Sequence, residues 1–363
     1  MELISTLKEL HKKLPSYGFE PDEEAVLADY LAFLREREDL LTLAQTYHDD
    51  IFEHHRYTLA EVECLPENDG REEGLLFAAL YLARYERLEE VLAERGIPGR
   101  YKAGSLFLYK TVFRKNKNCY GSYGLRGMYR SSATHYMTPD KFILGRLCFE
   151  VTKFSSSYEV YRNTKTGEAL PIAQPGFQYM EDGKRAKKDY DGPLLEPYLK
   201  EEGDTLECFT FLESGRLQME PIQLHLPDYE KALKTGDSII SVHIPAEGRM
   251  TPELVDEAFK LAEEFFPKYF PDVDVKAWMC GSWLLNTDMQ EFLKPDSNII
   301  RFQKRFRVVL TGPNGYSLYW HIFGVENFVP LDELKPINKF QQTFLDRVKA
   351  GKTLYTGYGY ILK

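Results

Sequence analysis

Apolar residues recur with two different periods along the chain, and the change of period divides it in two. Over 24–34, 39–47 and 72–95 they recur every three or four residues, which predicts amphipathic helices. Beyond residue 142, the alternation of period two that is typical of strands appears over 145–154, 238–245, 275–280 and 302–310, with a hairpin over 207–220. The pattern therefore predicts an α+β protein. We expect an all-α N-terminal domain, residues 1–130, followed by a mixed β-sheet domain flanked by helices, residues 131–363.

One strand is followed directly by the signals of a loop and a helix. Ile240, Val242 and Ile244 alternate with more polar positions, and Pro245 ends the run because proline cannot donate to a strand ladder. Thr251 then stands where a helix N-cap belongs, before a proline in the first turn. A strand, a short loop and a helix N-terminus together can bind an anion through free backbone N–H groups. Further helices are predicted over 288–293 and 338–349, and the polar segment 181–191 is predicted to be an exposed loop.

Composition narrows the possible classes of protein. A length of 363 residues favours two domains, and 43% hydrophobic residues suffice for packed cores. The net charge of −10 argues against binding of nucleic acid or anionic membranes by the molecule as a whole. No apolar run approaches the roughly 18 residues of a membrane-spanning helix. The five cysteines are scattered without a Cys-x-x-Cys pair, so we expect reduced thiols in a cytoplasmic protein.

The segment 101–136 is basic and aromatic and contains no acidic residue. Such a stretch can bind single-stranded nucleic acid or a nucleotide-like cofactor. It is also typical of an amphipathic helix and a glycine-containing linker that pack within the protein. A second pattern, His48, Asp49 and Asp50 followed by His54 and His55, suggests metal ligands on one helical face, although such surfaces also arise by chance. We expect no metal site and no nucleic-acid partner.

Several stretches together resemble a bacterial two-domain family of acyltransferase-domain proteins, with a helical N-terminal domain and a GNAT-like C-terminal domain. The stretches that carry the resemblance are 144–150, 236–245, 280–285, 297–306 and 350–359. The resemblance implies acyl-CoA or acetyl-CoA as co-substrate. It places the CoA contacts at Ile244, Ala246, Gly248, Arg249, Met250 and Thr251.

The loop departs from the Gln/Arg-x-x-Gly-x-Gly/Ala pattern that GNAT enzymes use for the CoA pyrophosphate. Pro245 stands at the Gln/Arg position and Met250 at the final small position. Acidic residues also surround the loop, and their carboxylates would repel a pyrophosphate: Glu247, Glu253, Asp256 and Glu257.

Strand parity groups the candidate catalytic residues. Glu150 is expected on one face with Arg146, Cys148 and Thr152, and His243 on the polar face of its own strand. Histidine titrates near neutral pH and suits a general base, and Glu150 is a second candidate if its carboxyl is buried. The alternatives are a satisfied structural histidine and a salt bridge.

Two other kinds of catalytic group come from strand ends. Cys280 and Ser282 follow a predicted strand near a helix start, where a thiolate would be favoured. Tight packing of a small residue is the alternative for Cys280. Tyr358 and Tyr360 could offer a phenolic acid or simply belong to an aromatic C-terminal strand.

These interpretations lead to a first functional hypothesis, an acyl-CoA-dependent N-acyltransferase. It would move an acyl group directly to a small-molecule or peptide amine, without a metal and without a membrane partner. The alternative hypothesis is a non-catalytic GNAT-like binding or regulatory module that does not use CoA. The third is a nucleic-acid-binding protein that uses the basic stretch.

Overall fold

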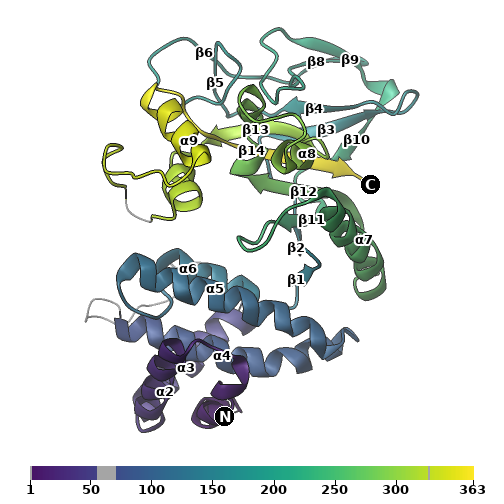
Figure 1. Ribbon diagram of the computed structural model, residues 1–363. Coiled ribbons are helices and arrows are strands. Elements are labelled where there is room, and N and C mark those ends of the chain that lie inside the picture. Colours follow the sequence, from purple (N-terminus) through teal and green to yellow (C-terminus); the bar gives the residue numbers. More distant parts are fainter. Residues whose placement is uncertain (1, 55–70, 326–327) are drawn as a thin grey trace. The chain divides into compact units, whose positions relative to one another are not determined.

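The computed structural model describes residues 2–54, 71–325 and 328–363 (Figure 1). By its internal contacts the chain divides into two units, Met1–Ile143 and Leu144–Lys363. The first unit is helical and the second is built on β-sheets, which confirms the α+β fold class predicted from the sequence.

The N-terminal unit is organised around one buried helix, α4 (Arg71–Glu94). Every residue from Leu76 to Ala83 is completely buried, so this helix is surrounded by its neighbours. The helices predicted over 24–34, 39–47 and 72–95 are confirmed as α2, α3 and α4. The other helices of the unit are α1 (Glu2–Glu9), α2 (Pro21–Arg35), α3 (Glu38–His48), α5 (Ala103–Tyr120) and α6 (Gly127–Tyr136).

A six-stranded sheet forms the centre of the C-terminal unit, in the order β1-β2-β11-β12-β14-β13. Its central pair, β11 and β12, is parallel, whereas β2 with β11, β12 with β14 and β13 with β14 are antiparallel. The strands are β1 (Lys141–Leu144), β2 (Leu147–Lys153), β11 (Ser238–His243), β12 (Val275–Ser282), β13 (Arg307–Pro313) and β14 (Tyr355–Leu362).

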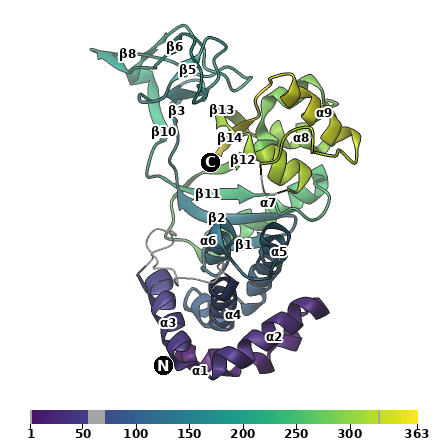
Figure 2. The ribbon, with the colours of Figure 1, turned by 90° about the vertical axis from the view of Figure 1, so that its left-hand side faces the viewer.

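The two faces of this sheet are covered differently. On one face Phe149 of β2 and Trp278 of β12 pack edge-to-face against Phe259 and Phe266 of α7 (Pro252–Tyr269). Figures 1 and 2 show α7 alongside β11 and β12. On the other face, Ile239 and other sheet residues share an apolar core with the chain between β2 and β11. Since side chains alternate along a strand, odd-numbered residues of β11 face this second core and even-numbered ones face α7.

The chain between β2 and β11 folds into short strands, which Figure 2 shows grouped at the top of the unit. They are β3 (Tyr158–Asn163), β4 (Ala169–Ala173), β5 (Tyr179–Met180), β6 (Leu194–Leu195), β7 (Lys200–Glu202), β8 (Thr205–Cys208), β9 (Ile222–His225) and β10 (Tyr229–Leu233). The hairpin predicted over 207–220 is only partly right. β8 pairs with β7 and β9, and the expected turn contains an isolated bridge between Phe211 and Leu217.

The strand predicted over 302–310 is wrong in its first half. Ser297 accepts a hydrogen bond from the N–H of Ile300 and caps a short helix, α8 (Asn298–Gln303), so that β13 begins only at Arg307. The segment predicted as a helix over 288–293 forms a 3₁₀ turn, Thr287–Glu291. The last predicted helix is confirmed as α9 (Lys339–Lys349), capped by Asn338. The aromatic C-terminal strand is also confirmed, as β14.

Candidate functional site

The two polar residues at the end of β11 and in the middle of β2 meet on one face of the sheet. The antiparallel register places Ser241 opposite Glu150 and His243 opposite Cys148, so the faces that parity predicted within each strand form one face with all four side chains. His243 Nε2 lies 2.8 Å from Glu150 Oε2. Because a carboxylate only accepts hydrogen bonds, Nε2 carries the proton in this contact.

The exposure of this pair suits acid–base chemistry. The side chain of His243 is 40% exposed, whereas that of Glu150 is 16% exposed. The imidazole can therefore meet a ligand while the carboxylate behind it fixes the orientation of the ring. A base within reach of substrate, held by a second group, is the arrangement that general-base catalysis needs.

The parallel strands β11 and β12 separate close to this pair. Their register runs from Ser238 with Val275 to Ser241 with Met279 and ends there, although β11 continues to His243 and β12 to Ser282. On their outer sides both strands stay paired to the end, with β2 and β14 respectively. The inner backbone edges of the two strand ends are thus not paired with one another. Ligands commonly bind at the carboxyl ends of parallel strands in open sheets.

Cys280 lies on the opposite face of the sheet from His243. Met279 is the register partner of Ser241 and shares its face, so the next residue, Cys280, points to the side of Trp278 and α7. The thiol is 1% exposed, and burial raises its pKa to about 12. The structure does not bring Cys280 together with His243. The thiol packs on the α7 side, without the electropositive surroundings of a reactive cysteine.

Ser282 has a structural contact of its own. Its hydroxyl oxygen accepts a hydrogen bond from the N–H of Leu284 and caps the 3₁₀ turn Trp283–Leu285. By parity Ser282 lies on the same face as Cys280. Cys280 and Ser282 were candidates because of their position at a strand end. Burial of Cys280 and the capping hydrogen bond of Ser282 explain both residues without a catalytic role.

The residues predicted to contact CoA form the connection from β11 to α7. From Ala246 to Arg249 they are exposed, and Gly248 has a φ of +88°, which a residue with a side chain rarely adopts. Thr251 occupies the N-cap position of α7, although its side chain makes no capping hydrogen bond. The structure places Ile244 and Met250, half-buried, at the two ends of this loop.

Two of the acidic residues near the loop have local partners. Asp256 pairs with Arg305, with 2.6 Å between Oδ1 and Nη1, which offsets its charge. Hydrogen bonds from its own backbone N–H and from Thr251 lower the pKa of Glu253, so this carboxylate stays charged at neutral pH. The acidic crowding inferred from the sequence is therefore reduced at Asp256 and remains at Glu253.

The strand position predicted for Arg146 is wrong. Its side chain does not lie on the strand face with Cys148 and Glu150, because Gly145 and Arg146 form the tight turn between β1 and β2. From that turn the guanidinium contacts the loop between β11 and α7. A glycine between two apolar runs was the signal that predicts such a turn.

The basic, aromatic stretch is largely used inside the helical unit. Lys110 donates to the carbonyls of Tyr17 and Gly18, both at 2.9 Å, and Lys117 pairs with Asp22 at 3.0 Å. The aromatic rings of this stretch also stack inward: Tyr109 with Phe113, and Phe113 with Tyr123. These contacts favour the interpretation of packing within the unit over a nucleic-acid interface.

The histidine cluster of the helical unit does not form a metal site in the part that is described. His48 is buried beside Asp49, and His54 lies near Asp50, while His55 is outside the described residues. Across 2–54, 71–325 and 328–363, no three His, Cys, Asp or Glu side chains are grouped to hold a metal ion. In the same ranges no helix has the length and apolarity needed to cross a membrane.

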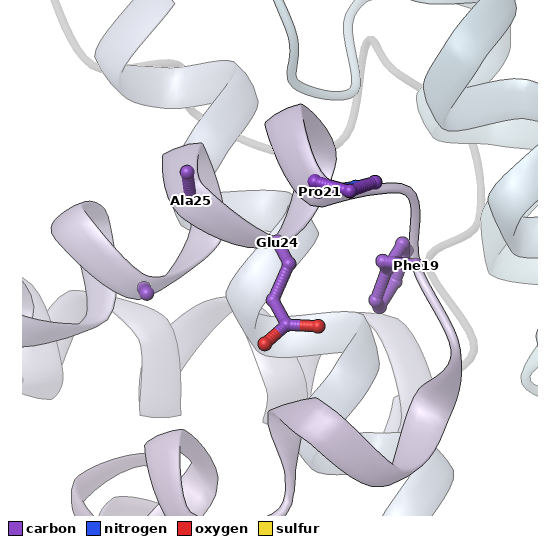
Figure 3. Close-up of a pocket in the computed structure, with 5 residues that line it drawn as sticks. Phe19, Pro21, Glu24 and Ala25 are labelled. Carbon is purple, nitrogen blue, oxygen red and sulfur yellow. The ribbon is translucent and has the colours of Figure 1, made fainter.

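A pocket of about 420 Å³ lies in the helical unit, and none of the predicted site residues lines it (Figure 3). It is an open depression at the start of α2, and Glu24 is its one ionisable lining residue. The lining residues are Phe19, Pro21, Glu24, Ala25 and Ala28. A single carboxylate among small apolar side chains offers no pair of groups for catalysis, so we place the candidate site at the end of β11 instead.

Comparison with known proteins supports the fold of the C-terminal unit. Residues 142–361 match the family described as GNAT-like C-terminal domain. This match confirms the GNAT-like domain that the resemblance implied. A search of the curated proteins found no match.

Solved structures of similar fold extend over both units. An acyltransferase in complex with decanoyl-CoA is 18% identical, with a TM-score of 0.58, and the match covers 90% of this chain and 79% of that one. An acyltransferase in complex with decanoyl-CoA and teicoplanin is also 18% identical, with a TM-score of 0.56 and coverages of 99% and 86%. A mutant acyltransferase in complex with octanoyl-CoA gives the same values. At this identity the likeness concerns the fold.

Proposed function

The chain belongs to the GNAT-like C-terminal domain family, and we propose that it is an acyl-CoA-dependent N-acyltransferase. One observation carries the proposal. The parallel strands β11 and β12 separate after Ser241 and Met279, and the His243–Glu150 pair lies at the end of one of them. A backbone opening and an oriented base are thereby found together within the C-terminal unit.

The opening supports the choice of an acyl-CoA. Unpaired strand edges offer N–H and C=O groups to an extended ligand that itself contains amides, and the pantetheine arm of CoA is such a ligand. The loop from Ala246 to Thr251 would then receive the diphosphate. The proteins of similar fold that hold decanoyl-CoA and octanoyl-CoA support the same co-substrate and suggest acyl chains of medium length.

The chemistry proposed is direct transfer. The amine of the acceptor attacks the thioester carbonyl, the C–N bond forms, and the C–S bond breaks to release the CoA thiol. His243 accepts the proton that the amine loses and passes it to the departing thiolate, and the Glu150 carboxylate stabilises the imidazolium formed in between. No acyl-cysteine intermediate is invoked, because Cys280 is buried on the other face of the sheet.

The acceptor is proposed as a small molecule with an amine. A protein of similar fold has been solved with teicoplanin, a small-molecule ligand, which favours such a partner over a large surface. The identity of the amine is left to experiment.

A thiol-release assay tests the function. Wild-type protein is incubated with decanoyl-CoA and a panel of amines, and free CoA thiol is followed by a chromogenic disulfide. We expect thiol release that depends on one class of amine, with the matching acyl-amide found by mass spectrometry. If the protein binds decanoyl-CoA but no amine in the panel accelerates thiol release, the proposed panel of acceptors is wrong. If it binds no acyl-CoA, the non-catalytic module becomes the better hypothesis.

A further inference from the structure

Arg146 makes three hydrogen bonds to the backbone of one short loop. Its Nε donates to the carbonyl of Arg249 at 3.0 Å, and its Nη2 donates to the carbonyls of Pro245 at 2.8 Å and Gly248 at 3.1 Å. A planar guanidinium with fixed donors can hold several carbonyls at once, which a flexible ammonium group cannot do in the same way.

The turn that supplies Arg146 is itself fixed against α7. Gly145 has a φ of +61°, which suits a two-residue hairpin between β1 and β2. A Cβ atom at this position would lie 3.3 Å from the Cα of Ala258 on α7. The close approach requires a glycine, and it keeps the neighbouring arginine beside the loop that leads into α7.

These contacts fix the direction in which the loop presents its N–H groups. In a trans peptide the C=O and N–H bonds point in opposite directions. Since the carbonyls of Pro245, Gly248 and Arg249 face the guanidinium, the N–H groups of Ala246, Arg249 and Met250 face away from it. Within the described ranges of the chain, none of these three N–H groups donates a hydrogen bond to another group.

We propose that Arg146 is a positioning residue for the diphosphate of CoA: it holds the loop carbonyls so that the N–H groups of Ala246, Arg249 and Met250 are directed at the anion. This inference rests on the function proposed above. It also explains how the loop can serve although Pro245 replaces the Gln or Arg of the usual GNAT pattern. The guanidinium of Arg146, which comes from a separate hairpin, holds the carbonyl side of the loop and leaves the N–H side to the ligand.

The test compares two probes that differ at the diphosphate. Coenzyme A contains it, with the adenosine 3′-phosphate attached, and pantetheine contains neither, so a loss that affects only the first reports on the part of the ligand beyond the pantetheine arm. Binding of each probe is measured by calorimetry for the wild-type chain, Arg146→Gln and Arg146→Lys. Arg162→Gln serves as a matched control, because it removes an arginine that donates to a backbone carbonyl, that of Lys363 at 3.3 Å, outside this loop.

Arg146→Gln is expected to weaken CoA binding about tenfold, since it removes charge-assisted hydrogen bonds that order the loop, and to change pantetheine binding less than about twofold. Arg146→Lys keeps the positive charge but lacks the planar set of fixed donors, and it is expected to weaken CoA binding about threefold. Arg162→Gln should stay within about twofold of wild type for both probes. In turnover, Arg146→Gln should raise the KM for acyl-CoA and leave kcat nearly unchanged.

The outcomes separate this inference from the proposed function. If the wild-type chain binds CoA and both Arg146 variants bind it equally well, the role of Arg146 is overturned and the function stands. If the variants lose CoA and pantetheine in the same proportion, Arg146 is structural and the inference is also overturned. If the wild-type chain binds neither probe, both proposals fail. Should Arg146→Gln not fold, Arg146→Lys with the same two probes decides.

Discussion

β11 and β12 run in parallel and end at the same edge of the sheet, but their polar residues have different environments. β11 ends in His243, a partly exposed imidazole held by Glu150 at 2.8 Å. β12 ends in Cys280, which is buried, and Ser282, whose hydroxyl caps the next turn. The type of residue at a strand end is therefore a poor guide to function, and its face and its hydrogen-bond partner are better ones.

The covering of the sheet explains the difference. The even-numbered residues of β11 and β12 point toward α7, where Phe149, Trp278 and Phe259 form a tight aromatic cluster. Cys280 belongs to that side, so its thiol is enclosed. The odd-numbered residues point to the other face. There the apolar core buries Ile239 completely, whereas the side chain of His243 remains partly exposed.

The largest effect is expected from His243→Ala. Loss of a general base typically costs about 100-fold or more in turnover, and we expect that loss in kcat with the amine found by the thiol-release screen. CoA binding and the unfolding midpoint should stay close to wild type, because the side chain is partly exposed. Turnover within a factor of two of wild type would remove His243 from the mechanism.

Glu150→Gln should have a smaller effect on the same quantity. The amide can still accept a hydrogen bond from the imidazole, but it no longer stabilises a positive charge on the ring, so we expect kcat to fall about tenfold. Steady-state kinetics at fixed pH measures this. Equal turnover for Glu150→Gln and wild type would show that the carboxylate is not needed.

At the end of β12, Ser282→Ala should lower the free energy of unfolding and leave turnover unchanged. Removal of a capping hydroxyl costs about 1 kcal/mol, which urea unfolding can measure. Turnover should remain within about twofold of wild type once saturating substrate compensates for the lower stability. A large fall in kcat without loss of stability would contradict the structural role of Ser282.

The smallest effect is expected from chemical modification of Cys280. Because burial raises the pKa of this thiol to about 12, the thiolate is scarce at neutral pH and increases only as the pH rises toward that value. Iodoacetamide at pH 8 should leave Cys280 unmodified in the native protein and label it after denaturation, as peptide mass spectrometry would show. Rapid labelling of the native protein, with loss of turnover, would revive a covalent role.

Sequence patterns were sufficient for the parts of the fold that depend on local periodicity. Helices α2, α4 and α9 follow from apolar spacing and end signals. Strand parity gave the faces of Glu150 and His243 within their own strands, whereas the pairing of β2 with β11 that joins those faces comes from the structure. The separation of β11 from β12 could not be predicted, because it depends on which strands become neighbours.

Three other features could not be predicted from local sequence patterns. The strands between β2 and β11 are only two to six residues long, so their local alternation is weak. Arg146 acts on carbonyls about a hundred positions further along the chain, and the capping hydroxyl of Ser297 changed a predicted strand into α8. In each case a tertiary contact or a single cap outweighed the local pattern.

Acyl-CoA binding by the chain is tested most directly by thermal unfolding of the wild-type protein with and without decanoyl-CoA. A ligand present at about 100 times its dissociation constant adds roughly 2.7 kcal/mol to the stability of the native state, enough to raise the midpoint by several degrees. We expect such a rise for the wild-type chain and also for His243→Ala, because this substitution affects the chemistry and not the binding. A midpoint that stays the same at saturating concentrations of decanoyl-CoA, octanoyl-CoA and acetyl-CoA would contradict this expectation.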